Sequence, residues 1–215
     1  MRKVQSNILV LVLLFSLPVS GQENDFQSWF SFSVNKKIVK KTTLSIKSAL
    51  RLRENSSLYS KQFFDGRIKR KFNKKLSYAV GFRYINKWNI ADNIEKQYRF
   101  YGDISYRSKL SKRFNYSTRS RWQKQENLYD DKITLRQKVN LSYNIRKTKL
   151  RPSFATELFF SLEDNLIDKM RYTCSLAYPL AKKLDFVLAY RVQQEFYVNN
   201  PKTLFIFEGK LAYDL

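Results

Sequence analysis

Apolar and polar residues alternate with a period of two along most of this chain, and this pattern limits the fold more than any other feature. In the clearest segment, 76–88, every second residue from Leu76 to Trp88 is apolar or aromatic except Asn86, and the residues between them are mostly small or basic. Successive side chains of a β-strand point to opposite faces, so each such segment predicts a strand with one apolar and one polar face. Helical periodicity is almost absent, and we therefore predict an all-β protein.

About eleven such segments, each of roughly eleven residues, follow one another along the chain. They lie at 26–36, 42–53, 61–72, 76–88, 97–110, 114–123, 132–145, 150–161, 170–180, 184–196 and 204–215. Short basic turns follow the odd-numbered segments, and longer polar loops, most of which carry acids, follow the even-numbered ones. About eleven tilted residues rise about 28 Å, close to the hydrocarbon thickness of a bilayer. We predict an antiparallel up-and-down transmembrane β-barrel with about 10–12 strands.

The number of segments raises a question about how the barrel closes. Bacterial outer-membrane barrels usually have an even number of strands, with both chain ends at the same rim. An odd number places the two ends at opposite rims, and the few residues of 22–25 reach at most ~14 Å, too short to cross back. Either one segment is miscounted or the first strand pairs in an unusual way.

The N-terminus has the three parts of a secretory signal peptide. A short basic stretch containing Arg2 and Lys3 precedes the apolar run 8–17, and small residues follow at 18–21. The apolar run is too short to span a bilayer, which takes about 20 residues. We predict that residues 1–21 are removed on export and that residues 22–215 form the barrel domain; a buried strand or an amphipathic helix is the alternative.

One face of nearly every segment is polar from end to end and rich in Arg and Lys, in a chain with 41 Lys+Arg against 18 Asp+Glu. A soluble barrel would carry this face on its outside, so we predict that it faces the lumen and that the apolar face meets lipid. The predicted lumen-facing charged network comprises Arg51, Asp65, Arg67, Arg83, Arg99, Asp103, Arg119, Arg136, Glu157, Arg171, Arg191, Glu195 and Glu208. Such a network either plugs the lumen through carboxylate–guanidinium pairs or leaves a narrow passage that favours anions.

The composition excludes several classes of site. The chain has no histidine and a single cysteine, Cys174, which rules out His-dependent catalysis, a Cys/His zinc site and a disulfide framework. We expect no catalytic residue, no cofactor and no metal. Basic residues interleaved with aromatics can indicate nucleic-acid binding. Export and the placement of the aromatics on the face opposite the bases argue against it here, so we expect no nucleic-acid partner.

Three turns repeat a basic pattern between apolar residues: Phe72-Asn73-Lys74-Lys75-Leu76, Leu110-Ser111-Lys112-Arg113-Phe114 and Leu180-Ala181-Lys182-Lys183-Leu184. Together with the signal peptide and the Gln-Glu-Asn-Asp-Phe start of the mature chain, these turns resemble a Bacteroidota family of unknown function, DUF2490, whose members look like outer-membrane barrels. The resemblance implies the outer membrane of a Gram-negative bacterium, with outer-membrane lipid around the barrel. It supplies no catalytic residue.

These observations lead to one expected function and two alternatives. We expect a non-enzymatic outer-membrane barrel with a largely plugged basic lumen and a structural or surface-interaction role in the envelope. The first alternative is a narrow channel in which small anions are the solutes, and the second is a soluble periplasmic barrel that binds an apolar ligand. The sequence specifies no oligomeric state.

Overall fold

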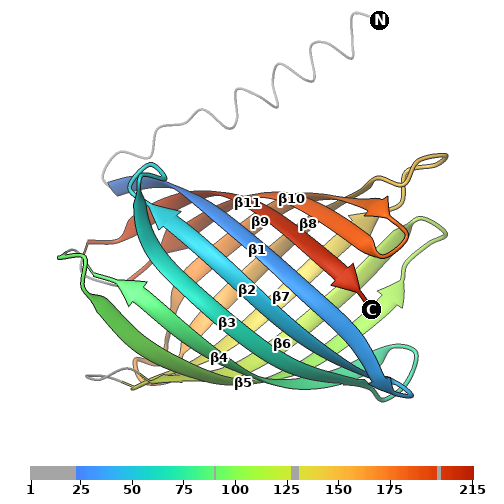
Figure 1. Ribbon diagram of the computed structural model, residues 1–215, viewed down its shortest axis with the longest axis horizontal. Helices are drawn as coiled ribbons and strands as arrows, with labels where there is room; N and C mark the ends of the chain where they lie inside the picture. Colours follow the sequence, from blue (N-terminus) through green and yellow to red (C-terminus); the bar gives the residue numbers. More distant parts are fainter. Residues whose placement is uncertain (1–22, 90, 127–130, 198–199) are drawn as a thin grey trace, which may run out of the picture.

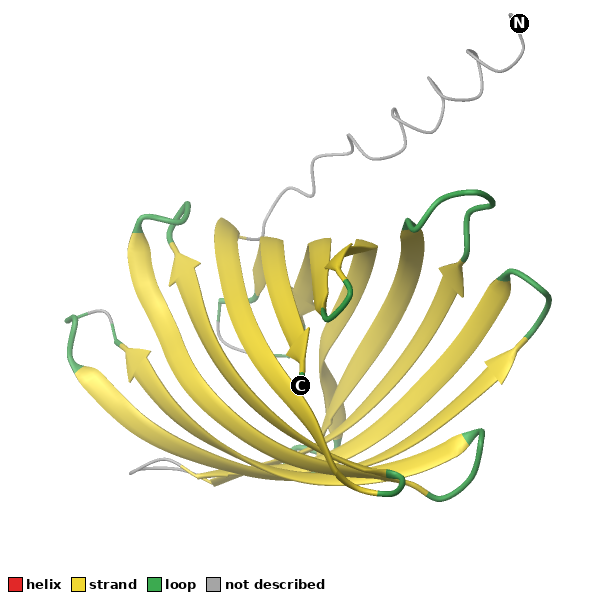
Figure 2. Cartoon of the chain, turned by 45° about the vertical axis from the view of Figure 1, so that its right-hand side comes forward, coloured by secondary structure: helices red, strands yellow, loops and turns green. Residues whose placement is uncertain are grey.

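A computed structural model describes residues 23–89, 91–126, 131–197 and 200–215, and its eleven strands close into one barrel (Figure 1). The strands are β1 Glu23–Val39, β2 Thr42–Arg53, β3 Leu58–Lys71, β4 Leu76–Trp88, β5 Ile94–Lys109, β6 Phe114–Glu126, β7 Asp131–Tyr143, β8 Arg151–Ser161, β9 Leu166–Ala181, β10 Leu184–Glu195 and β11 Lys202–Asp214. The predicted signal peptide, 1–21, lies outside the described residues. Every regular element that the structure describes is a strand (Figure 2), and no helix in this part of the chain is long and apolar enough to cross a membrane.

The barrel closes through a parallel seam between its first and last strands. Strand β1 pairs in parallel with β11, with Glu23 opposite Lys202 and Asn35 opposite Asp214, and all other neighbouring strands pair antiparallel. Near the end of the seam, Asn35 Nδ2 donates a hydrogen bond to Asp214 Oδ1 over 2.9 Å. The count of eleven segments is therefore correct, and the unusual pairing of the first strand resolves the odd number. Closure leaves no unpaired sheet edge.

Two rims follow from this topology. We call the rim with the connections after β1, β3, β5, β7 and β9 the turn end, and the rim with the connections after β2, β4, β6, β8 and β10 the loop end. Strand β1 starts at the loop end and β11 finishes at the turn end, so the described chain begins and ends at opposite rims (Figure 1).

The predicted contrast between short turns and longer loops is slight and fails at one connection. The turn-end connection 144–150 is longer than the loop-end connection 54–57. Strands β3, β5 and β9 begin before the predicted starts at 61, 97 and 170, because backbone pairing continues into residues where the alternation of apolar and polar side chains is not regular. Acids assigned to loops, such as Glu95 and Asp168, consequently lie within strands.

Alternation along each strand separates an apolar outer face from a polar inner face. In β4, Val80 is 60% exposed on the outside, whereas its neighbour Ala79 is 3% exposed on the inside. Large apolar side chains cover the outer face on every side of the barrel, among them Phe30, Ile46, Phe64, Ile68, Val80, Phe100, Ile104, Leu135, Phe154, Leu176, Tyr190 and Phe207. The inner face buries charged and amide side chains instead, so the hydrophobic surface of this fold points outwards.

Candidate functional site: the charged lumen

A cavity of about 580 Å³ occupies the lumen. It extends from Asn35 near the turn end to Lys132 and Asp168 near the loop end. Fifteen Lys and Arg residues line it, but only five Asp and Glu residues do. The wall of the cavity therefore carries a large excess of positive charge.

The structure brings the predicted charged network together around this cavity. The residues of that network that line it are Arg51, Asp65, Arg67, Arg83, Arg99, Arg119, Arg136, Glu157, Arg171, Arg191, Glu195 and Glu208. Asp103 is buried beside it and accepts hydrogen bonds from Arg121 Nε over 2.6 Å and from Arg67 Nη2 over 2.8 Å. Arg67 lies on β3 and Asp103 on β5, so this contact reaches over the strand between them.

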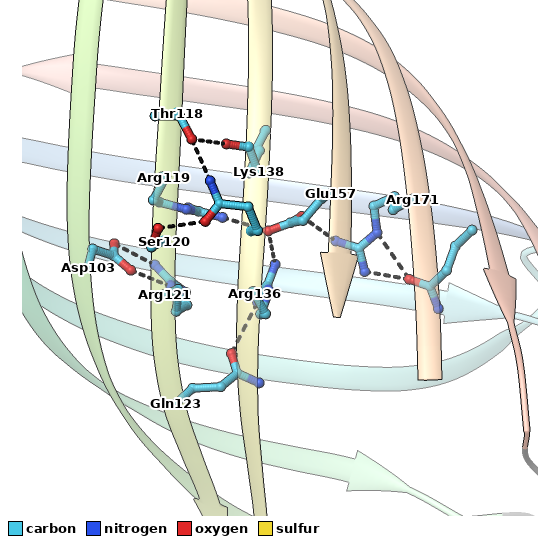
Figure 3. Close-up of polar contacts among 12 residues, drawn as sticks. Asp103, Thr118, Arg119, Ser120, Arg121, Gln123, Arg136, Lys138, Glu157 and Arg171 are labelled. Carbon is cyan, nitrogen blue, oxygen red and sulfur yellow. Dashed lines mark hydrogen bonds and ion pairs between the residues drawn. The ribbon is translucent and has the colours of Figure 1, made fainter. Parts of the chain in front are cut away.

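Three arginine side chains share the carboxylate of Glu157 on β8 (Figure 3). Its Oε1 accepts hydrogen bonds from Arg136 Nη2 over 2.7 Å and from Arg119 Nη2 over 2.8 Å, and its Oε2 lies 3.5 Å from Arg171 Nη1. Three guanidinium groups from β6, β7 and β9 thus converge on one carboxylate that is 3% exposed. The cluster fixes three arginines in place and still leaves a net positive charge.

A second cluster depends on a glycine. Asp65 accepts hydrogen bonds from Arg83 Nε over 2.7 Å and from the Tyr101 hydroxyl over 2.8 Å. The Tyr101 ring lies against Gly81 of β4, where an added Cβ would come within 2.3 Å of the ring. Only glycine permits this approach, so Gly81 positions the tyrosine that holds Asp65.

Paired charges also occur elsewhere along the lumen. Glu208 on β11 accepts hydrogen bonds from Arg191 and lies 3.2 Å from Lys210 Nζ. Towards the loop end, Lys169 pairs with Glu195 over 3.0 Å and Lys132 with Asp168 over 2.8 Å. The Arg191–Glu208 and Lys169–Glu195 pairs join adjacent strands, whereas Lys132 reaches from β7 over β8 to Asp168 on β9.

Aromatic rings are part of the inner face, and this corrects the prediction that the aromatics lie opposite the bases. The guanidinium of Arg51 stacks over Trp29 at 3.7 Å and that of Arg121 over Tyr101 at 3.8 Å, measured to the ring centroids. Arginines also stack on the two further inward rings, Phe63 and Phe159. Strand parity could have found these rings, since Phe63 lies two residues before Asp65 and Phe159 two residues after Glu157.

Several lining cations make no ion pair with an acid among the residues that the structure describes: Lys47, Arg51, Lys61, Arg99 and Lys138. A neutral side chain holds Arg99, whose Nε donates to Gln125 Oε1 over 3.0 Å. Cations without a carboxylate partner can pair with a solute anion that enters the cavity.

Neither a metal centre nor a thiol site is formed in the described part of the chain. No group of three or more His, Cys, Asp or Glu side chains lies close enough there to hold a metal ion. Cys174 is an exposed residue of the outer face, beside Leu176 and Tyr190.

Comparison with known proteins relates the chain to a family of unknown function and to a solved porin. The family described as "Protein of unknown function (DUF2490)" matches residues 26–203. The NanC porin, solved in a rhombohedral crystal form, superposes on 84% of this chain and 93% of its own, with a TM-score of 0.52 and 13% sequence identity. At this identity the likeness concerns the fold alone. No curated protein matches the sequence.

Proposed function

The chain belongs to the DUF2490 family of unknown function, and we propose that it is an outer-membrane channel that admits small anionic solutes. The observation that carries this proposal is the cavity of about 580 Å³, with its fifteen basic and five acidic lining residues. An excess of fixed positive charge in a narrow, low-dielectric passage raises the local concentration of anions and lowers that of cations. The fold shared with a porin supports the same function.

The two faces of the wall support a membrane location. The outer face exposes large apolar side chains on every strand, whereas soluble proteins rarely expose contiguous apolar patches larger than a few hundred Å². Closure satisfies the backbone polar groups that lipid cannot. A soluble barrel with an apolar ligand has less support, because charged groups line the lumen.

The plugged barrel is the second candidate, and the clusters around Glu157 and Asp103 favour it. Arginines from β3, β6, β7 and β9 reach these two acids from an adjacent strand or over one intervening strand, and the clusters take up part of the lumen. Such a barrel would serve the envelope without transport. The cavity, whose lining residues extend from near one rim to near the other, and the lining cations that pair with no acid in the described residues favour the channel.

Single-channel recording separates the two candidates. Purified full-length protein, added to a planar lipid bilayer in KCl, should give discrete current steps if the cavity conducts. Protein unfolded by boiling is the control and should give none. The folded state is checked by faster electrophoretic mobility before boiling. If folded protein gives no current steps, the channel is contradicted and the plugged barrel is retained.

Export and localisation belong to the same proposal. Residues 1–21 act as a signal peptide in it, and the Gram-negative, Bacteroidota source implied by the sequence resemblance accords with an outer membrane. N-terminal sequencing of the protein from the membrane fraction should begin at Gln22. A chain that retains Met1, or one recovered from the soluble periplasm, would contradict it.

A further inference from the structure

A second, smaller cavity of about 300 Å³ lies at the turn end of the barrel, and we call it the vestibule. Eight basic residues line it: Arg67, Lys69, Lys71, Lys74, Lys75, Arg107, Arg119 and Lys138. No acidic residue is among its lining residues. It shares Arg67, Arg119 and Lys138 with the main cavity, so the two cavities adjoin.

The strands and one turn bring these charges to a single place. Lys69 on β3 lies within electrostatic reach of Arg67, Lys71 and Arg107, and its one acidic neighbour, Asp103, is already bound by two arginines. The turn between β3 and β4 is fixed by the Asn73 side chain. Its Oδ1 accepts hydrogen bonds from the backbone N–H groups of Lys75 over 2.8 Å and Leu76 over 2.7 Å. The lysines of this turn are therefore held at the rim of the vestibule.

Two arginines that line the vestibule each have a buried donor without an acceptor in the described residues. Arg67 and Arg119 use their Nη2 atoms to bind Asp103 and Glu157, but the Nε atom of each is buried without a hydrogen-bond partner in the described residues. A buried donor without a partner is costly, and an anionic oxygen is its strongest acceptor. Polar neutral side chains, including Ser77, Ser105 and Ser117, line the same cavity and can donate further hydrogen bonds.

We propose that the vestibule binds a multiply charged oxyanion of the phosphate class. Eight cations line the vestibule and only Arg67 and Arg119 among them pair with an acid in the described residues, which favours several negative charges over one. Guanidinium forks and hydroxyl donors match oxygen atoms arranged around a tetrahedral centre. The lining residues lie mostly on the inward face, so the ligand is a soluble solute. The site goes beyond the proposed channel, because binding here does not require that the lumen conducts.

Isothermal titration calorimetry with inorganic pyrophosphate tests the site on full-length protein in neutral detergent at low salt. Pyrophosphate should bind, more tightly than sulfate, and its affinity should fall as KCl is raised from about 0.1 M to about 1 M, since the Debye length shrinks from about 10 to about 3 Å. The double variant Lys69→Gln/Arg107→Gln should raise the Kd about tenfold or more, because charge-assisted contacts are being removed.

The control is Lys112→Gln, which removes one positive charge from the next turn of the same rim, outside the vestibule lining. Its Kd should stay within about twofold of the wild type, because Lys112 is not among the residues that line the vestibule. Lys69 and Arg107 pair with no acid in the described residues, so their replacement spares the ion pairs of the barrel, and heat-shifted mobility checks folding. Absent binding, or equal weakening by both variants, would overturn the site. If pyrophosphate binds but the protein gives no bilayer current, the anion site is supported and only the proposed channel function is contradicted.

Discussion

The inner and outer faces of the barrel wall are built by the same strands but by different rules. On the inner face, polar groups have specific partners: three arginines share Glu157, and Tyr101 fits against Gly81 to reach Asp65. On the outer face, apolar side chains such as Val80 and Ile46 point away from the barrel. The inner face therefore depends on the identity of each residue, whereas the outer face depends only on its polarity.

The largest effect should come from an isosteric change on the inner face. Glu157→Gln removes the carboxylate shared by three guanidinium groups, and breaking a buried pair in this way costs about 3–5 kcal/mol. Phe64→Leu on the outer face, which stays apolar, should cost less than about 1.5 kcal/mol. Urea unfolding in lipid vesicles measures both, and equal losses would break the comparison.

When a charge is introduced, we expect the outer face to lose more stability than the inner face. Ile46→Arg places a guanidinium on the lipid side and should cost about 2–4 kcal/mol if the residue lies near the midplane. Its neighbour Ser45 lines the cavity, so Ser45→Arg should be tolerated with a smaller loss of folded protein. Heat-shifted mobility after refolding into vesicles reports the folded fraction. A greater loss for Ser45→Arg would mean that the faces are reversed.

Adding a methyl group at a glycine should destabilise the inner face, which is tightly packed, more than the outer face, but by less than the changes above. Gly81→Ala drives a Cβ into the Tyr101 ring and should cost about 1–3 kcal/mol through overpacking. Gly102→Ala is the matched control in the next strand, where an added Cβ meets nothing within 4 Å. Adding Tyr101→Leu should recover part of the Gly81→Ala loss in a double-mutant cycle. Purely additive losses would mean that the ring and the glycine are not coupled.

The period of two in the sequence predicts much of this fold, because the face to which a strand residue points depends only on whether its position is odd or even. It predicts eleven strands and places Val80 outside and its neighbour Ala79 inside. It does not predict the parallel seam, since no local pattern in β1 specifies that its partner is β11. The alternation also does not predict which charged residues form ion pairs. Arg67 on β3 reaches over β4 to Asp103 on β5, a contact that depends on the curvature of the closed barrel.

The positions of the inward aromatic rings could be predicted from strand alternation, but the prediction that all aromatics lie opposite the basic residues is wrong for them. Trp29 and Phe63 have the parity of the inner face, yet composition alone suggests that rings gather on the lipid side. Their inner position has a physical reason, because the guanidinium of Arg51 stacks on both rings in place of pairing with an acid. Parity is therefore the stronger signal, and composition should not override it.

The zero-current potential across a bilayer tests the central claim most directly, namely that the basic inner face forms an anion path. With wild-type protein and a tenfold KCl gradient, the potential should have the sign of chloride selectivity and shrink at high salt as the fixed charges are screened. A potential of the opposite sign, or none at low salt in a conducting bilayer, would contradict the account.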